Sequence, residues 1–202
     1  IPGMEVTLKN CTDLLLYFYN KSEMIEFYDK HVKDKKVPNN IFNLNKTSLD
    51  VEEIFDFLKD YNAVTCIAHP FAMYPKSCRL KAKNSPLDRV DMIEVLNGEM
   101  RKWRNNRAIN FARRENVAMI AASDGHTMSE VGQCVTGCRA EDIEGLFGEI
   151  IHKNNILIGR EIWGTQRISA QLTVLGKNFR LKLPTLFPNS KIKSYLRSKI
   201  AE

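Results

Sequence analysis

The sequence predicts an α/β fold built on a parallel sheet, and three observations lead to this class. Apolar runs of strand length alternate with amphipathic segments in units of about 20–35 residues, the spacing of repeated β–α units. The run "AVTCIAH" at 63–69 is continuously apolar up to Pro70, as is typical of a strand buried on both faces. The hydrophobic content of 44% is that of a globular chain, and no apolar run approaches the roughly 20 residues of a membrane span.

The individual elements follow from hydrophobic periodicity. Strands are predicted where short apolar runs end at turn-forming residues, at 4–8, 13–19, 63–69, 90–97, 117–123 and 155–159. Helices are predicted where apolar residues recur every three or four positions, at 22–32, 49–61, 99–115 and 140–153. We expect residues 1–164 to form the main domain and residues 165–202 to form a basic helical tail that packs on it or extends from it.

The charge is concentrated at the end of the chain. The formal net charge is +6, and residues 177–202 alone carry seven Lys and Arg against one Glu. The tail is either a solvated end helix or a contact for an anionic surface such as nucleic acid or a membrane. This distribution argues against a body built as a whole to hold nucleic acid.

The five cysteines include no Cys-x-x-Cys pair, and the chain shows no secretory signal. Both features favour reduced thiols and a cytoplasmic location. The chain opens with Ile1 instead of Met, which leads us to expect further sequence upstream.

Polar residues follow the predicted strands at the positions where α/β proteins carry their active sites. His69 ends one apolar run, Asn97 ends another, and Asp124 and His126 follow a third. Glu5 lies inside the first strand. Glutamate, aspartate and histidine are the ligands of divalent ions such as Zn²⁺, Mn²⁺ or Fe²⁺. We therefore expect a metal site, although His69 alone could be a hydrogen-bonded core residue and Asp124 could cap a helix starting near Thr127.

Four segments occur along the chain in the order "IPGMEV", "CIAHP", "DMIEVLNG" and "SDGHTMSEVGQ". In sequence and in order they resemble segments of the PHP family (polymerase and histidinol phosphatase phosphoesterases). The resemblance implies a distorted (β/α)7 barrel with two or three metal ions at the carboxyl ends of its strands, and hydrolysis of phosphate esters. An early His-x-His segment of the family has no counterpart in this chain. The first strands of the barrel are therefore expected upstream of it.

Carried over by position, the resemblance makes Glu5 a metal-bridging carboxylate and His69, Asp124 and His126 further ligands. Asp13 holds a place where the family often has a histidine, so its part in binding metal stays open. Asp124 and His126 are also the candidate catalytic residues. Arg79 and Lys81 could hold the substrate phosphate or could be ordinary surface charges.

Two classes of function follow from these residues. The first is a metal-dependent phosphoesterase, in which a metal-activated water attacks phosphorus in a phosphorylated small molecule or a short oligonucleotide. The second is a degenerate PHP domain that binds a phosphorylated ligand or nucleic acid without turnover. The sequence names neither the substrate, the metal, nor the oligomeric state.

Overall fold

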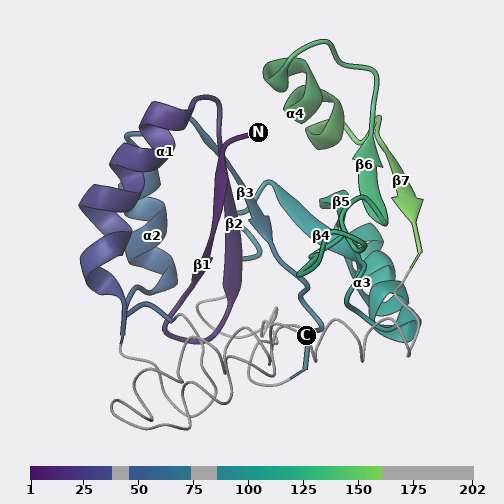
Figure 1. The fold of residues 1–202 in the computed structure, drawn as a ribbon, viewed down its shortest axis with the longest axis horizontal. Helices are drawn as coiled ribbons and strands as arrows, with labels where there is room; N and C mark the ends of the chain where they lie inside the picture. Colours follow the sequence, from purple (N-terminus) through teal and green to yellow (C-terminus); the bar gives the residue numbers. More distant parts are fainter. Residues whose placement is uncertain (38–45, 74–85, 161–202) are drawn as a thin grey trace, which may run out of the picture.

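A five-stranded sheet in the order β1-β2-β3-β4-β5 lies at the centre of the computed structural model, which describes residues 1–37, 46–73 and 86–160 (Figure 1). Its strands are β1 (Gly3–Thr7), β2 (Asp13–Phe18), β3 (Ala63–Ile67), β4 (Met92–Asn97) and β5 (Ala118–Ala122). All five coincide with strands predicted from the sequence. The α/β class is therefore confirmed.

The sheet is mixed, so the expectation of a wholly parallel sheet is wrong at β2. This strand runs antiparallel to both β1 and β3, whereas β3, β4 and β5 are mutually parallel. The reversal follows from the short connection after β1, where the Leu8 amide donates to the Thr12 carbonyl at 2.8 Å and Cys11 adopts a φ of 66°. A connection this short can join only antiparallel neighbours. Within the described residues the sheet stays open and forms no closed barrel.

Four α-helices flank the sheet, and each overlaps a predicted helix. They are α1 (Lys21–Phe27), α2 (Val51–Leu58), α3 (Lys102–Arg114) and α4 (Ile143–Ile151). A π-helical turn at Tyr28–Val32 and a 3₁₀ turn at Lys33–Lys35 extend α1. A second, antiparallel pair joins β6 (Cys134–Gly137), which was not predicted, to β7 (Ile156–Gly159). Four residues of mixed polarity give too little periodicity to identify β6 as a strand.

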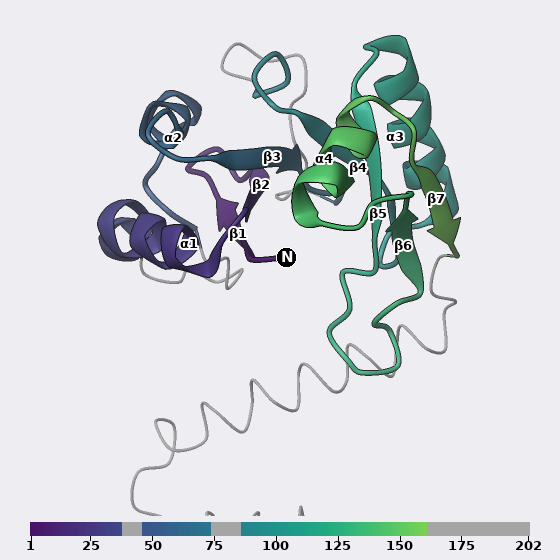
Figure 2. The same cartoon turned by 90° about the horizontal axis from the view of Figure 1, so that it is seen from above.

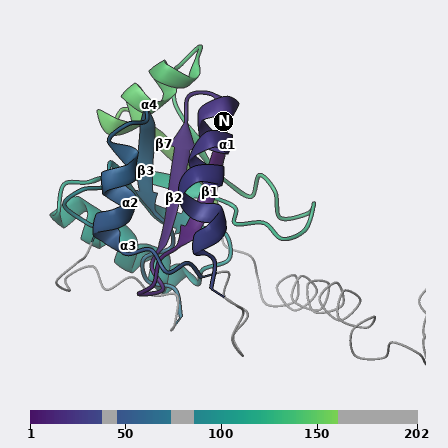
Figure 3. The ribbon, with the colours of Figure 1, turned by 90° about the vertical axis from the view of Figure 1, so that its left-hand side faces the viewer.

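The two faces of the sheet pack against different helices (Figures 2 and 3). One face joins strand residues such as Leu16, Ile67 and Ile93 to apolar side chains of α1, α2 and α3. The other face, which includes Cys66, packs against Phe147 and the rest of the apolar side of α4. Because helices cover both faces, β3 reads as a continuous apolar run, as its sequence indicated.

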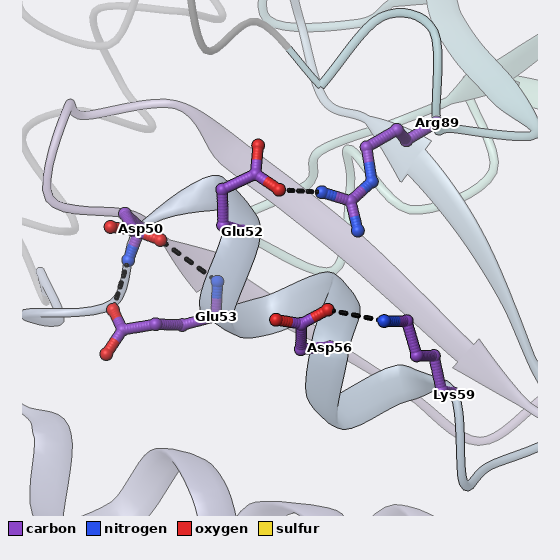
Figure 4. A network of polar contacts seen from close by, with 6 residues as sticks. All are labelled: Asp50, Glu52, Glu53, Asp56, Lys59 and Arg89. Atoms are coloured by element: carbon purple, nitrogen blue, oxygen red, sulfur yellow. Dashed lines mark hydrogen bonds and ion pairs between the residues drawn. The ribbon is translucent and has the colours of Figure 1, made fainter.

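The amino end of α2 is held by a reciprocal cap and tied to the chain before β4 (Figure 4). The Asp50 carboxylate accepts from the Glu53 amide at 2.9 Å, and the Glu53 carboxylate accepts from the Asp50 amide at 2.9 Å. This capping box satisfies two backbone donors that a helix end leaves open. Arg89 pairs with Glu52 and lies over the Phe55 ring, 4.5 Å from its centroid, so α2 is fixed beside the approach to β4.

The ends of β4 and β5 approach each other at Gly98 more closely than any side chain would allow. A Cβ atom built at Gly98 would lie 2.6 Å from the Ser123 carbonyl oxygen, and the Gly98 amide already donates to the Ala122 carbonyl at 3.1 Å. This contact immediately precedes Asp124. The glycine therefore sets the spacing of the two strand ends.

We predict that Gly98→Ala lowers the free energy of unfolding by about 1–3 kcal/mol, because backbone must move to admit the methyl group. The matched control is Gly148→Ala in α4, where nothing lies within 4 Å of the built Cβ atom. That change should stabilise the helix by roughly 0.5–1 kcal/mol. Chemical denaturation measures both values, and equal effects of the two substitutions would contradict the close approach.

Candidate metal centre

Because β2 is antiparallel to its neighbours, its first residue lies at the end of the sheet where β1 and β3 finish (Figure 1). Asp13 pairs with Thr7, the last residue of β1, and its carbonyl accepts from the Ala68 amide at 3.0 Å. His69 is the next residue along from Ala68. The residue that begins β2 and the residue that follows β3 therefore lie side by side, although 56 positions separate them in the sequence.

Three of the predicted ligands come together at this end of the sheet. Glu5, Asp13 and His69 each present one possible ligand atom, and these atoms lie within 4.8 Å of one another. Asp13 and His69 are buried, with 1% and 6% of their surfaces exposed, while Glu5 is exposed. The His69 Nε2 atom lies 3.6 Å from the Asp13 Oδ2 atom. Two carboxylates and one imidazole thus converge from three adjacent strands.

The backbone is strained at both strand ends that carry candidate ligands. His69 has a φ of 25° and Asp124 a φ of 49°, values that side-chain-bearing residues seldom adopt. Such conformations cost roughly 1–3 kcal/mol each and concentrate at functional sites. At His69 the backbone amide donates to the Glu94 Oε2 atom at 2.6 Å, which helps to hold the conformation.

Asp124 is connected to this group through two buried residues of β4. The Asn97 Nδ2 atom donates to the Glu94 Oε2 atom at 3.0 Å and to the Asp124 Oδ2 atom at 3.2 Å. Glu94 and Asn97 are three positions apart and would point to opposite faces of a regular strand. The pairing of β4 with β5 shifts register between Glu94 and Leu96, and this bulge accounts for their meeting.

Glu94 is a buried acid in a site that already contains other carboxylates. Burial raises its pKa to about 7, and the Asp124 carboxylate adds to the rise. His69 and the hydrogen bond from Asn97 oppose it. Near neutral pH, Glu94 is therefore divided between its protonated and ionised forms while it holds the His69 backbone and the Asn97 amide.

His126 lies in a different group from the other predicted ligands. Glu99, His126 and Glu130 present ligand atoms within 4.8 Å of one another. The buried Glu130 carboxylate accepts from the backbone amides of His126 and Thr127 at 2.8 Å each, so it orders the loop. The His126 Nδ1 atom lies 2.9 Å from the Asp124 carbonyl oxygen, which links this group to the first.

One expectation from the sequence is settled by this loop. No helix begins at Thr127, so the alternative that Asp124 caps such a helix is wrong, and the amides there are satisfied by Glu130. The predicted phosphate contacts Arg79 and Lys81 lie outside the described residues, as does the basic tail.

Sequence reasoning missed Glu94, Glu99 and Glu130 as members of the site. Glu94 carried a signal, because it is the one charged residue inside the apolar run "MIEVL" of a predicted strand. Glu99 and Glu130 carried none that separates them from ordinary surface acids. Their position depends on how the loops after β4 and β5 fold.

We predict that Glu94→Gln changes the pH dependence of stability of the metal-free chain. The pKa of Glu94 rises from 4.5 to about 7 on folding, so the unfolded chain loses this proton first as the pH increases. The free energy of unfolding of the wild type should therefore fall by about 3 kcal/mol between pH 4.5 and pH 7 through this group alone.

In Glu94→Gln this loss should be absent, which urea denaturation in EDTA at pH 5 and pH 8 would measure. Glu141→Gln, which removes an exposed carboxylate before α4, is the control and should follow the wild type. Parallel curves for Glu94→Gln and the wild type would refute the raised pKa.

The comparisons with known proteins agree with the fold and the motifs. A family model described as PHP-associated matches residues 102–154, which run from the start of α3 past the end of α4. A search of the curated proteins found no match. No helix in the described parts of the chain has the length and apolar character needed to cross a membrane.

Three solved structures have similar folds. Endonuclease Q from Pyrococcus furiosus, described as lesion-specific, is 20% identical over 77% of this chain, with a TM-score of 0.55. Endonuclease Q in complex with a 27-mer duplex carrying an abasic lesion is 19% identical over 79% of this chain, with a TM-score of 0.54. PsfC from Pseudomonas syringae PB-5123 is 17% identical, covers 91% of this chain and 66% of its own, and has a TM-score of 0.51. This chain spans 40–42% of the length of the endonuclease Q chains.

The family match is confined to residues 102–154, about a quarter of the chain, and the solved structures have a similar fold. Both findings agree with the resemblance to the PHP family in the ordered motifs around Glu5, His69 and Asp124.

Proposed function

We propose that this protein is a metal-dependent phosphoesterase whose site lies where β1 and β3 end and β2 begins. The observation that carries the proposal is the buried pairing of Asp13 with His69 beside Glu5. Buried carboxylates are costly unless they are paired with a cation or coordinate a metal. Asp13 therefore serves as a ligand in its own right, in the place where the family often has a histidine.

The spacing of these groups fits a divalent ion. At 3.6 Å, the distance from His69 Nε2 to Asp13 Oδ2 exceeds that of a hydrogen bond. Two ligands that each lie about 2.1 Å from a tetrahedral ion are separated by about 3.4 Å. An N,O,O ligand set suits Zn²⁺, Mn²⁺ or Fe²⁺. Asp124 and His126, linked to the group through Asn97 and the Asp124 backbone, would complete sites for a second or third ion.

A bound ion would lower the pKa of a water molecule and neutralise charge on the phosphoryl oxygens. Glu5, Asp13 and His69 would hold the ion, and Asn97 would orient Asp124 through its hydrogen bond to Oδ2. His126 is exposed next to Asp124 and is the group placed to meet the substrate. We assign the catalytic roles to Asp124 and His126.

The proposal includes two broader features. The open sheet would form part of a distorted (β/α)7 barrel, in which further strands continue from β1 or β5. The protein would act in the cytoplasm, in keeping with four described cysteines that are all free thiols.

Binding without turnover is the second candidate, and Asp13 is the observation that favours it. An aspartate in place of a neutral imidazole adds a negative charge to the site, which weakens the ion's pull on electrons of the water and substrate oxygens. The ligand set would then hold a metal and a phosphate group but accelerate hydrolysis little.

We predict that Asp13→Asn weakens binding of Mn²⁺ by more than about 10-fold, because even residues that only support metal ligands cost 10–100-fold when changed. Isothermal titration of the 202-residue chain measures the affinity. Asp60→Asn, which removes an exposed carboxylate at the end of α2, is the control and should leave it unchanged.

Hydrolysis of bis(p-nitrophenyl) phosphate and of p-nitrophenyl phosphate should rise with added Mn²⁺ and fall in parallel with affinity in Asp13→Asn. A chain that binds Mn²⁺ but cleaves neither ester would support the binding-only candidate. A chain that binds no Mn²⁺, Zn²⁺ or Fe²⁺ would overturn both.

A further inference from the structure

Helix α3 concentrates positive charge in a body, residues 1–176, that has a formal net charge of zero as a whole. Its segment Lys102–Arg114 contains five Lys and Arg and no Asp or Glu, and the preceding cap residue, Arg101, adds another positive charge. Soluble helices usually mix the two signs on their exposed faces. A one-sign helix is a feature that packing does not require.

The charge lies on one face of the helix. The side that packs on the sheet is made of Asn105, Ala108, Phe111 and Ala112. The exposed side carries only basic residues, asparagines and one tryptophan: Lys102, Trp103, Asn106, Arg107, Asn110, Arg113 and Arg114. We call these seven residues the α3 basic face. At 1.5 Å per residue it extends over about 18 Å.

Most of these charges have no carboxylate partner among the residues that the structure describes. Arg114 pairs with Glu115, whereas Lys102, Arg107 and Arg113 form no ion pair in the described ranges. The turns that extend α1 and the end of α2 differ, since Lys30, Lys33 and Lys59 each pair with an acid three or four residues earlier. The basic face of α3 is thus available to an external anion.

The first turn of α3 adds an aromatic surface among its cations. Trp103 is 54% exposed, and the guanidinium of Arg104 lies 4.9 Å from the centre of its ring. Arg101 and Lys102 are exposed beside it. An exposed indole among cations is the combination that single-stranded nucleic-acid sites use to stack a base.

This first turn is also attached to the candidate metal centre. Asn105 exchanges two hydrogen bonds with the backbone of Asn97, at 3.2 and 3.0 Å, and the Asn97 side chain holds Asp124. The Asn97 side chain also accepts from the Glu99 amide at 2.9 Å. The basic face therefore begins beside the metal centre and leads away from it along α3.

We infer that the α3 basic face binds the phosphate backbone of single-stranded nucleic acid, with a base stacked on Trp103, and so presents a phosphodiester to the metal centre. The inference rests on the proposed function for its last step only. A membrane fits less well, because the apolar side of α3 is already buried against the sheet and cannot enter a bilayer. A duplex fits less well, because its bases are covered and offer no face to Trp103.

The test is fluorescence anisotropy with a labelled 12-residue oligothymidylate in EDTA, where binding is measured without cleavage. The triple variant Lys102→Gln, Arg107→Gln, Arg113→Gln should bind at least 10-fold more weakly at low salt. Its slope of log K against log salt should fall by about 2, because each phosphate contact on a single strand contributes about 0.7. Trp103→Ala should weaken binding by about 5- to 150-fold.

The matched control is Lys30→Gln, Lys33→Gln, Lys59→Gln, which removes the same charge from the turns after α1 and from the C-cap of α2. It should bind as the wild type does. The inference would be overturned if the wild type did not bind, if the control lost as much affinity as the triple variant, or if the matching duplex bound more tightly. It would also be overturned if the triple variant lost binding to phosphatidylserine vesicles but kept its affinity for the oligonucleotide.

Hydrolysis of bis(p-nitrophenyl) phosphate separates this inference from the proposed function. The triple variant should cleave this small diester as the wild type does, since no residue of the basic face belongs to the metal centre. Intact oligonucleotide binding with no diester cleavage would reject the phosphoesterase alone. Equal loss of both activities in the triple variant would reject the separate role of the basic face.

Discussion

The buried contact between Asp13 and His69 is the constraint on which the rest of the site depends. A carboxylate and an imidazole are placed inside the protein at 1% and 6% exposure, a placement that folding opposes unless the charges are compensated. The tight reversal after β1 is what brings them together, because it makes β2 antiparallel and turns its first residue toward the end of β3. Glu5, on the neighbouring strand, completes the set.

The second half of the site depends on an irregularity in β4. The bulge after Glu94 lets Glu94 and Asn97 share a hydrogen bond, and Asn97 then connects the residues around His69 with Asp124, which follows β5. Asn97 is also held by Asn105 of α3, so the site and the basic helix are positioned by the same residue. This shared support is the structural basis for the proposed path along α3 to the metal centre.

The sequence was sufficient for the strands and helices, because their apolar periods are regular, and for Glu5, His69, Asp124 and His126 as polar residues near strand ends. It was not sufficient for the direction of β2, which depends on a five-residue connection, or for the β4 bulge, which leaves no trace in periodicity. The separation of His126 from the other ligands was also missed, since Asp-x-His spacing alone suggests one shared centre. Whole-chain charge pointed to the tail, whereas the local charge of α3 becomes meaningful only when its exposed face is known.

The central claim is that Glu5, Asp13 and His69 form a metal site. The most direct measurement is anomalous diffraction at the manganese edge from crystals of the chain grown with Mn²⁺. The account predicts an anomalous peak within about 2.0–2.3 Å of a ligand atom of each of these three residues. A peak confined to Glu99, His126 and Glu130, or a structure in which the Asp13–His69 contact persists without any peak, would contradict it.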